Sequence, residues 1–114
     1  YVLQVANSAH RKMTAYRDNL NFQLGQILRY EDIYYDKYSA LKTVFSHFNL
    51  SVDNSVLQEV SSENDVRPTS EDQSKHIRKG TPGDHVNKLQ PDTILKLNEK
   101  FSDLAEFYGY DLST

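Results

Sequence analysis

The sequence predicts an α/β fold in which this chain is mostly helical and holds one short strand. Apolar residues recur at helical spacing in four segments, the pattern of helices that bury one face. Between the first two segments, residues 26–30 are short and apolar at Ile27 and Leu28, which indicates a buried strand. A central strand needs neighbouring strands on both sides. We therefore expect residues 1–114 to be the carboxy-terminal portion of one domain whose amino-terminal half is absent.

Three helices are predicted from apolar periodicity in the first half of the chain. The first helix is indicated by apolar residues at spacings of four, three, four and three, which are Val2, Ala6, Ala9, Met13 and Tyr16. A second helix is expected between Tyr38 and Phe48, and a third over residues 52–60 with Ser51 or Asp53 as its N-cap.

The last predicted helix carries the clearest end signals. Pro91 suits its first turn, Asp92 favours its positive end, and Gly109 is a typical residue just past its carboxy terminus. Before it, residues 61–83 are rich in Ser, Asn, Asp, Pro and Gly, and an irregular stretch of that length is usually functional or disordered. The buried face of the last helix is predicted to comprise Ile94, Leu97, Phe101, Leu104 and Tyr108.

Composition restricts the classes of function. The formal net charge of −3 argues against a general nucleic-acid binder, which needs a broad basic surface. The absence of cysteine excludes disulfides, thiol catalysis and cysteine zinc sites, and it favours a reducing compartment, so a cytoplasmic location is expected. No apolar run is long enough to span a bilayer. The four histidines have no metal-ligand spacing, so no metal site is predicted.

A basic, glycine-containing segment is the strongest functional signal. Lys75, Arg78 and Lys79 lie beside Gly80 and Gly83 in a chain that is acidic overall. Glycine lets backbone N–H groups close around a phosphate oxygen, while Arg and Lys supply a planar fork and a point charge. The pattern indicates an anion-binding loop. The alternative from the residues alone is a solvated basic loop without a ligand.

Three segments resemble, in order and spacing, the sulfotransferases that use 3′-phosphoadenosine-5′-phosphosulfate (PAPS). The first is Arg78-Lys79-Gly80, with Gly83-Asp84 shortly after it. Upstream, residues 27–33 read Ile-Leu-Arg-Tyr-Glu-Asp-Ile, and downstream, residues 97–101 read Leu-Asn-Glu-Lys-Phe. The resemblance extends from about Gln26 to Tyr110.

The resemblance implies the carboxy-terminal part of the P-loop-like α/β sulfotransferase fold and a role in binding PAPS. Arg78, Lys79 and the Gly80 backbone would hold the 3′-phosphate, and Ser61 is a lesser candidate near the adenine. Two positions depart from the family: His85 replaces a common Trp, and Glu63 stands where an aromatic residue would stack on adenine.

The implied reaction transfers a sulfuryl group from PAPS to a hydroxyl or amine of an unidentified small-molecule or glycan acceptor. The family's donor loop and general base lie upstream of the matching region, so no catalytic residue is predicted, and the isolated chain is expected to be inactive. Glu31 and Asp32 are predicted to be structural. If the amino-terminal half is absent, the apolar face on which it would pack is left exposed, and such a face can drive self-association of the chain.

Two other functions fit the same residues. The first is a non-catalytic helical interaction module derived from the same scaffold. The second is a nucleic-acid binder that uses the basic loop, which predicts strong binding to any polyanion with a steep salt dependence. We rank the nucleic-acid binder last.

Overall fold

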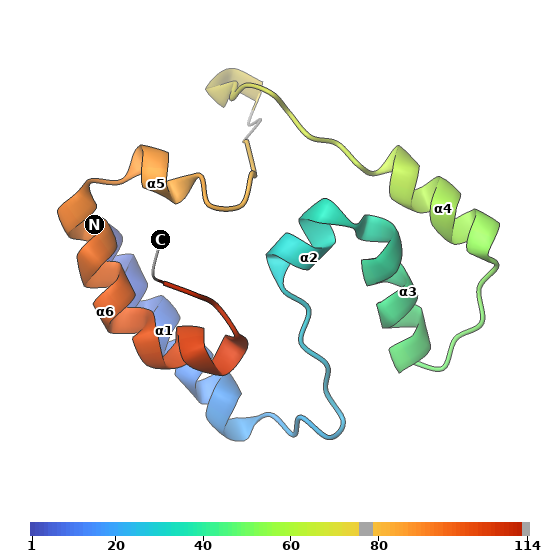
Figure 1. Ribbon diagram of the computed structural model, residues 1–114, viewed down its shortest axis with the longest axis horizontal. Helices are drawn as coiled ribbons and strands as arrows, with labels where there is room; N and C mark the ends of the chain where they lie inside the picture. The colour runs from blue at the N-terminus through green and yellow to red at the C-terminus, as the bar shows by residue number, and fades with distance from the viewer. Residues whose placement is uncertain (76–78, 113–114) are drawn as a thin grey trace. The chain divides into compact units, whose positions relative to one another are not determined.

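The computed structural model describes residues 1–75 and 79–112 (Figure 1). It divides into two compact units: a terminal unit formed by Tyr1–Gly25 with His85–Thr114, and a central unit formed by Gln26–Asp84. All elements of the described residues are helices, and their bounds are α1 Val2–Asn19, α2 Tyr30–Tyr35, α3 Lys37–His47, α4 Asn54–Glu63, the short 3₁₀ helix η1 Gln73–Lys75, α5 His85–Lys88 and α6 Pro91–Tyr108.

The terminal unit is built from α1 and α6, which lie side by side and run in the same direction (Figure 1). Its core consists of Ala6 from α1 with Leu104 and Ala105 from α6, each at most 7% exposed. Polar contacts join the helices at their edge: Asp103 accepts a 2.9 Å hydrogen bond from Arg17 and lies 3.3 Å from the His10 ring nitrogen. These contacts fix the register of the two helices.

The ends of α6 agree with the sequence signals. Pro91 occupies its first turn, and Gly109 follows its last residue in the left-handed conformation, with φ of +74°. The Tyr110 amide then donates to the Ala105 carbonyl at 2.8 Å, which turns residues 109–112 back over the helix. The helix predicted from Pro91 to Tyr108 is confirmed.

The central unit is built on the packing of α3 with α4, and α2 packs on α3. Its most buried residues are Ala40, Leu57 and Ser61. Asp53 caps α4 by accepting a 2.8 Å hydrogen bond from the Ser55 amide, so Asp53 is the N-cap of the two candidates. Hydrogen bonds from the Ser55 hydroxyl and then from the Ser55 amide lower the pKa of the Asp53 carboxyl.

The predicted α/β class is wrong for this chain, because the described residues contain no strand and no sheet. The expected strand over residues 26–30 is an irregular segment that ends at Arg29 in an extended conformation, and α2 begins at Tyr30. Two causes are visible. Ile27 and Leu28 have no neighbouring strand with which to pair, and the acidic residues that follow favour the amino-terminal turn of a helix.

The other elements follow the sequence closely. The helices expected over the segments now seen as α1, α3 and α4 are present, whereas α2 and α5 are short helices that periodicity did not indicate. The irregular stretch expected over residues 61–83 is interrupted in its described part only by the end of α4 and by η1. None of the described helices is both long and apolar enough to cross a membrane.

Candidate functional site

The basic loop is attached to α2 by two tyrosine hydroxyls. Tyr30 Oη donates a 2.6 Å hydrogen bond to the Gly80 carbonyl, and Tyr34 Oη lies 3.4 Å from the Thr81 hydroxyl. Tyr30 and Tyr34 are four residues apart, so one face of α2 presents both hydroxyls. Tyr30 belongs to residues 27–33, and Gly80 belongs to the Arg78-Lys79-Gly80 segment. Two of the three segments that carry the sequence resemblance are therefore in contact inside the central unit.

The Tyr30 hydroxyl approaches Gly80 closely. A Cβ atom at position 80 would lie 2.6 Å from Tyr30 Oη, far inside the normal contact distance. The next nearest atom, Tyr30 Cζ, would lie 3.9 Å away, an ordinary contact. The tyrosine hydroxyl therefore excludes any larger residue here unless its ring moves.

The loop offers two groups that can donate to an anion. Among the described residues, neither the Lys79 ammonium nor the Gly80 N–H has a hydrogen-bond partner, and both residues are exposed. The Lys79 N–H donates to a Glu71 carboxylate oxygen at 3.3 Å. The Glu71 carboxylate thus occupies one backbone donor of the loop and competes with a bound anion for it.

The remaining predicted residues are placed as follows. Arg78 lies outside the described residues. Ser61 is buried in α4, where its hydroxyl donates to the Gln58 carbonyl at 3.0 Å. No contact between Ser61 and residues 79–81 is found in the described part of the chain, and its hydrogen bond lies within α4. Its contact with adenine stays a prediction.

Lys37, Asp65 and Arg67 form a charged network that contacts the Tyr34 ring through Arg67. This network was not predicted from the sequence. The Arg67 guanidinium lies 5.0 Å from the centre of the Tyr34 ring. Asp65 accepts hydrogen bonds from Lys37 and Arg67, and these two cations lower the pKa of its carboxyl. Asp65 thereby links α3 to the segment that contacts Tyr34. No periodicity in the sequence signals such a contact.

Asp32 has the structural role that the sequence predicts for it. Its carboxylate accepts two hydrogen bonds from the Arg29 guanidinium, at 3.0 and 3.1 Å, which lowers its pKa. The pair fixes the first turn of α2 and hence the position of Tyr30.

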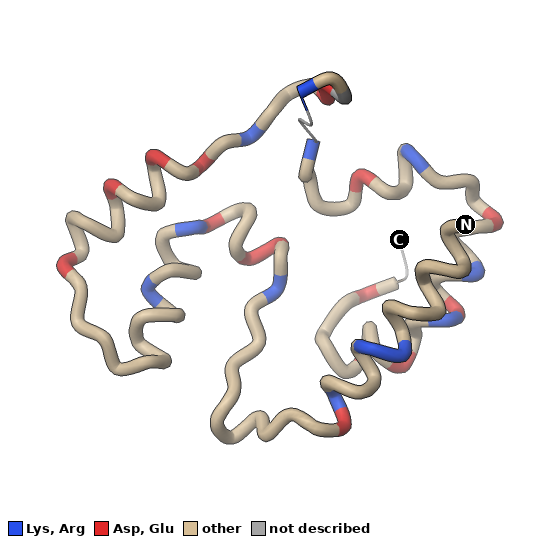
Figure 2. The backbone as a smooth tube through the Cα atoms, turned by 180° about the vertical axis from the view of Figure 1, so that it is seen from behind, with Lys and Arg blue, Asp and Glu red and all other residues tan. Residues whose placement is uncertain are grey.

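Charge elsewhere is mixed. Lys and Arg are interspersed with Asp and Glu along both units (Figure 2). In the part of the chain that the structure describes, no group of three or more His, Asp or Glu side chains is arranged to hold a metal ion. The loop over residues 79–81 is therefore the site that the geometry supports best.

The chain matches no family model, no curated protein and no solved structure.

Proposed function

We propose that residues 78–80 bind the 3′-phosphate of PAPS, and of its product adenosine 3′,5′-bisphosphate, in a PAPS-dependent sulfotransferase. The observation that carries the proposal is the hydrogen bond from Tyr30 to the Gly80 carbonyl. It joins two segments, fifty residues apart, by which the sequence resembles that family. The proposal needs the loop and α2 but not the predicted strand over residues 26–30, which the structure shows as an irregular segment.

The groups of the loop fit a phosphate dianion. The Gly80 N–H and the Lys79 ammonium have no partner among the described residues, and Arg78 would add a planar, bidentate donor. Hydrogen bonds to a charged group are the strong ones, worth roughly 1.5–3 kcal/mol each. The 3′-phosphate also distinguishes PAPS from ordinary adenine nucleotides, so this loop would provide selectivity for the nucleotide.

In the proposed reaction the sulfur of PAPS forms a bond to a hydroxyl or amine of the acceptor and breaks its bond to the 5′-phosphate. Positioning and charge stabilisation supply most of the rate in such transfers. This chain contributes the 3′-phosphate contacts, and none of its residues is assigned to the donor loop or to the general base. We also propose that the protein is located in the cytoplasm, as the absence of cysteine favours.

Calorimetry with adenosine 3′,5′-bisphosphate and adenosine 5′-monophosphate tests the proposal. We expect saturable heat from the bisphosphate and at least a tenfold lower affinity for the monophosphate, which lacks the 3′-phosphate. Equal affinity for the two nucleotides would remove the 3′-phosphate from the site. Equally tight binding of an unrelated polyanion, with a steep salt dependence, would favour the nucleic-acid binder.

A helical interaction module is the second candidate, and the exposed apolar side chains favour it. Leu24 is 76% exposed and Val66 is 75% exposed. A module of this kind predicts no heat with either nucleotide. The calorimetric titration therefore separates the two functions.

A further inference from the structure

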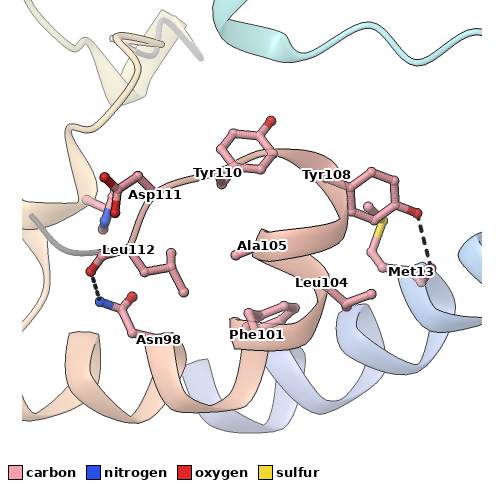
Figure 3. Close-up of a pocket in the computed structure, with 10 residues that line it drawn as sticks. Met13, Asn98, Phe101, Leu104, Ala105, Tyr108, Tyr110, Asp111 and Leu112 are labelled. Carbon is pink, nitrogen blue, oxygen red and sulfur yellow. Dashed lines mark hydrogen bonds between the residues drawn. The ribbon is translucent and has the colours of Figure 1, made fainter.

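The terminal unit contains a cavity that the proposed nucleotide site does not use. It lies under residues 109–112 and has a volume of about 310 Å³ (Figure 3). Its walls are mostly apolar and come from four segments: Met13 from α1, His85 from α5, Phe101, Leu104 and Ala105 from α6, and Tyr110 and Leu112 from the segment above α6.

The segment above the cavity is fixed at both ends. The Tyr110 amide donates to the Ala105 carbonyl at 2.8 Å, and the Leu112 carbonyl accepts from the Asn98 side chain at 3.4 Å (Figure 3). The second bond is long and therefore weak. The turn at Gly109 and the Asn98–Leu112 bond place residues 109–112 over the cavity.

The chemistry of the walls selects a neutral ligand. Among the lining residues there is no Lys or Arg, and the ionisable ones are His85, Tyr108, Tyr110 and Asp111. The Asp111 carboxylate repels an anion, and burying any charged ligand against mostly apolar walls is costly. Aromatic residues instead offer ring faces and edges for another ring.

The volume limits the size of the ligand. An apolar cavity of about 150 Å³ is sufficient for one benzene ring. The cavity under residues 109–112 is about twice as large, so it can hold two fused rings. It lies at the small end of the range for ligand sites, which begins near 300 Å³.

One polar atom can orient such a ligand. Asn98 lines the cavity, and its amide nitrogen donates to Leu112. Its amide oxygen accepts no hydrogen bond from the described residues. A partly buried acceptor of this kind is best satisfied by a ligand that donates one hydrogen bond.

We propose that this cavity is a binding site for a neutral two-ring aromatic molecule that donates one N–H hydrogen bond to Asn98 Oδ1. The site is separate from the loop over residues 79–81 and does not depend on the function proposed for it.

Indole is the probe, because the chain contains no tryptophan and indole fluorescence excited beyond the tyrosine absorption reports only the ligand. We expect saturable binding to the full 114-residue chain with a Kd near or below about 1 mM. 1-Methylindole, which has the same rings without the N–H donor, should bind roughly 3- to 10-fold more weakly.

Two variants locate the site. Ala105→Leu fills the cavity and should abolish saturable binding, with helicity checked by circular dichroism. Asn98→Ala changes a partly buried residue and should make indole and 1-methylindole bind equally. Asn7→Ala, at an exposed position on α1 away from the cavity, is the matched control and should leave both affinities unchanged.

The proposal is overturned if indole shows no saturable binding to the folded chain. It is also overturned if binding persists in folded Ala105→Leu, or if the preference for indole over 1-methylindole persists in Asn98→Ala. Should Ala105→Leu fail to fold, the Asn98→Ala comparison alone decides the outcome.

Discussion

The Tyr30 hydroxyl donates a 2.6 Å hydrogen bond to the carbonyl of Gly80, a residue fifty positions further along the chain. The bond fixes the backbone of Gly80 from its carbonyl side, while the N–H of the same residue has no partner among the described residues. A loop held in this way presents a donor in a defined position, which lowers the entropy lost on binding an anion.

Tyr30→Phe should weaken binding of adenosine 3′,5′-bisphosphate by about 3- to 10-fold, because it removes the one bond that holds the Gly80 carbonyl to α2. Calorimetry measures the affinity, and amide hydrogen exchange at Thr81 reports on the loop. Tyr35→Phe is the matched control, because the Tyr35 hydroxyl makes no hydrogen bond within the described residues. An equal effect of both changes would show that the Tyr30–Gly80 bond does not matter for binding.

Gly80→Ala should weaken nucleotide binding more than Tyr30→Phe does, because the added Cβ would meet the tyrosine hydroxyl at 2.6 Å. In the Tyr30→Phe background the same Gly80→Ala change should cost much less, since the nearest ring atom would then be at 3.9 Å. A double-mutant cycle by thermal unfolding and calorimetry measures this coupling. Strictly additive effects would contradict the close contact.

Glu71→Gln should raise the affinity for adenosine 3′,5′-bisphosphate by about 3- to 10-fold, because the Glu71 carboxylate occupies the Lys79 N–H and repels a second anion. Glu71→Asp keeps the charge but shortens the side chain, so it separates the contact from the charge. The matched control is Glu59→Gln, which removes an exposed carboxylate on α4. Unchanged or weaker binding by Glu71→Gln would show that the carboxylate does not compete with the ligand.

The terminal unit should lose stability in acid through Asp103. Hydrogen bonds from Arg17 and then from His10 lower the pKa of this carboxyl, so the folded state favours the charged form. The stabilisation is complete above the ordinary aspartate pKa of about 4, and it is lost as the pH falls through the lowered pKa of the folded chain. Thermal unfolding followed by circular dichroism between pH 7 and pH 2 measures the loss.

Asp103→Asn should lower the midpoint of unfolding at pH 7 by about 2–5 °C and reduce its dependence on acid. Asp92→Asn is the control within the same helix, because the ion pair of Asp92 with Lys96 lies along α6 and Asp92 is highly exposed. If the two variants shift the midpoint equally at every pH, Asp103 does not join α1 to α6.

The sequence predicts α6 well because independent signals agree there. Its apolar stripe, Pro91 at the start and Gly109 at the end each indicate the same bounds. Residues 26–30 carry only a short apolar run, which fits a strand or a helix-flanking segment equally, and the charges that decide the matter lie after it at Glu31 and Asp32.

The sequence is enough to propose the residues of the candidate site, but not the contacts that hold them. Residue types alone identify Lys79 and Gly80 as a loop suited to an anion. The contact of Tyr30 with Gly80 and that of Arg67 with Tyr34 join residues far apart in the chain, and no local pattern encodes such pairs. The i, i+4 spacing of Tyr30 and Tyr34 becomes a signal only once α2 is known to be a helix.

Calorimetric titration of adenosine 3′,5′-bisphosphate into the chain and into its Arg78→Ala variant tests the central claim most directly. We predict saturable binding to the unmodified chain and about a 10- to 100-fold loss in the variant, as expected when a charge-assisted hydrogen bond to the 3′-phosphate is removed. Identical affinities for the two proteins, or no binding to the unmodified chain, would contradict it.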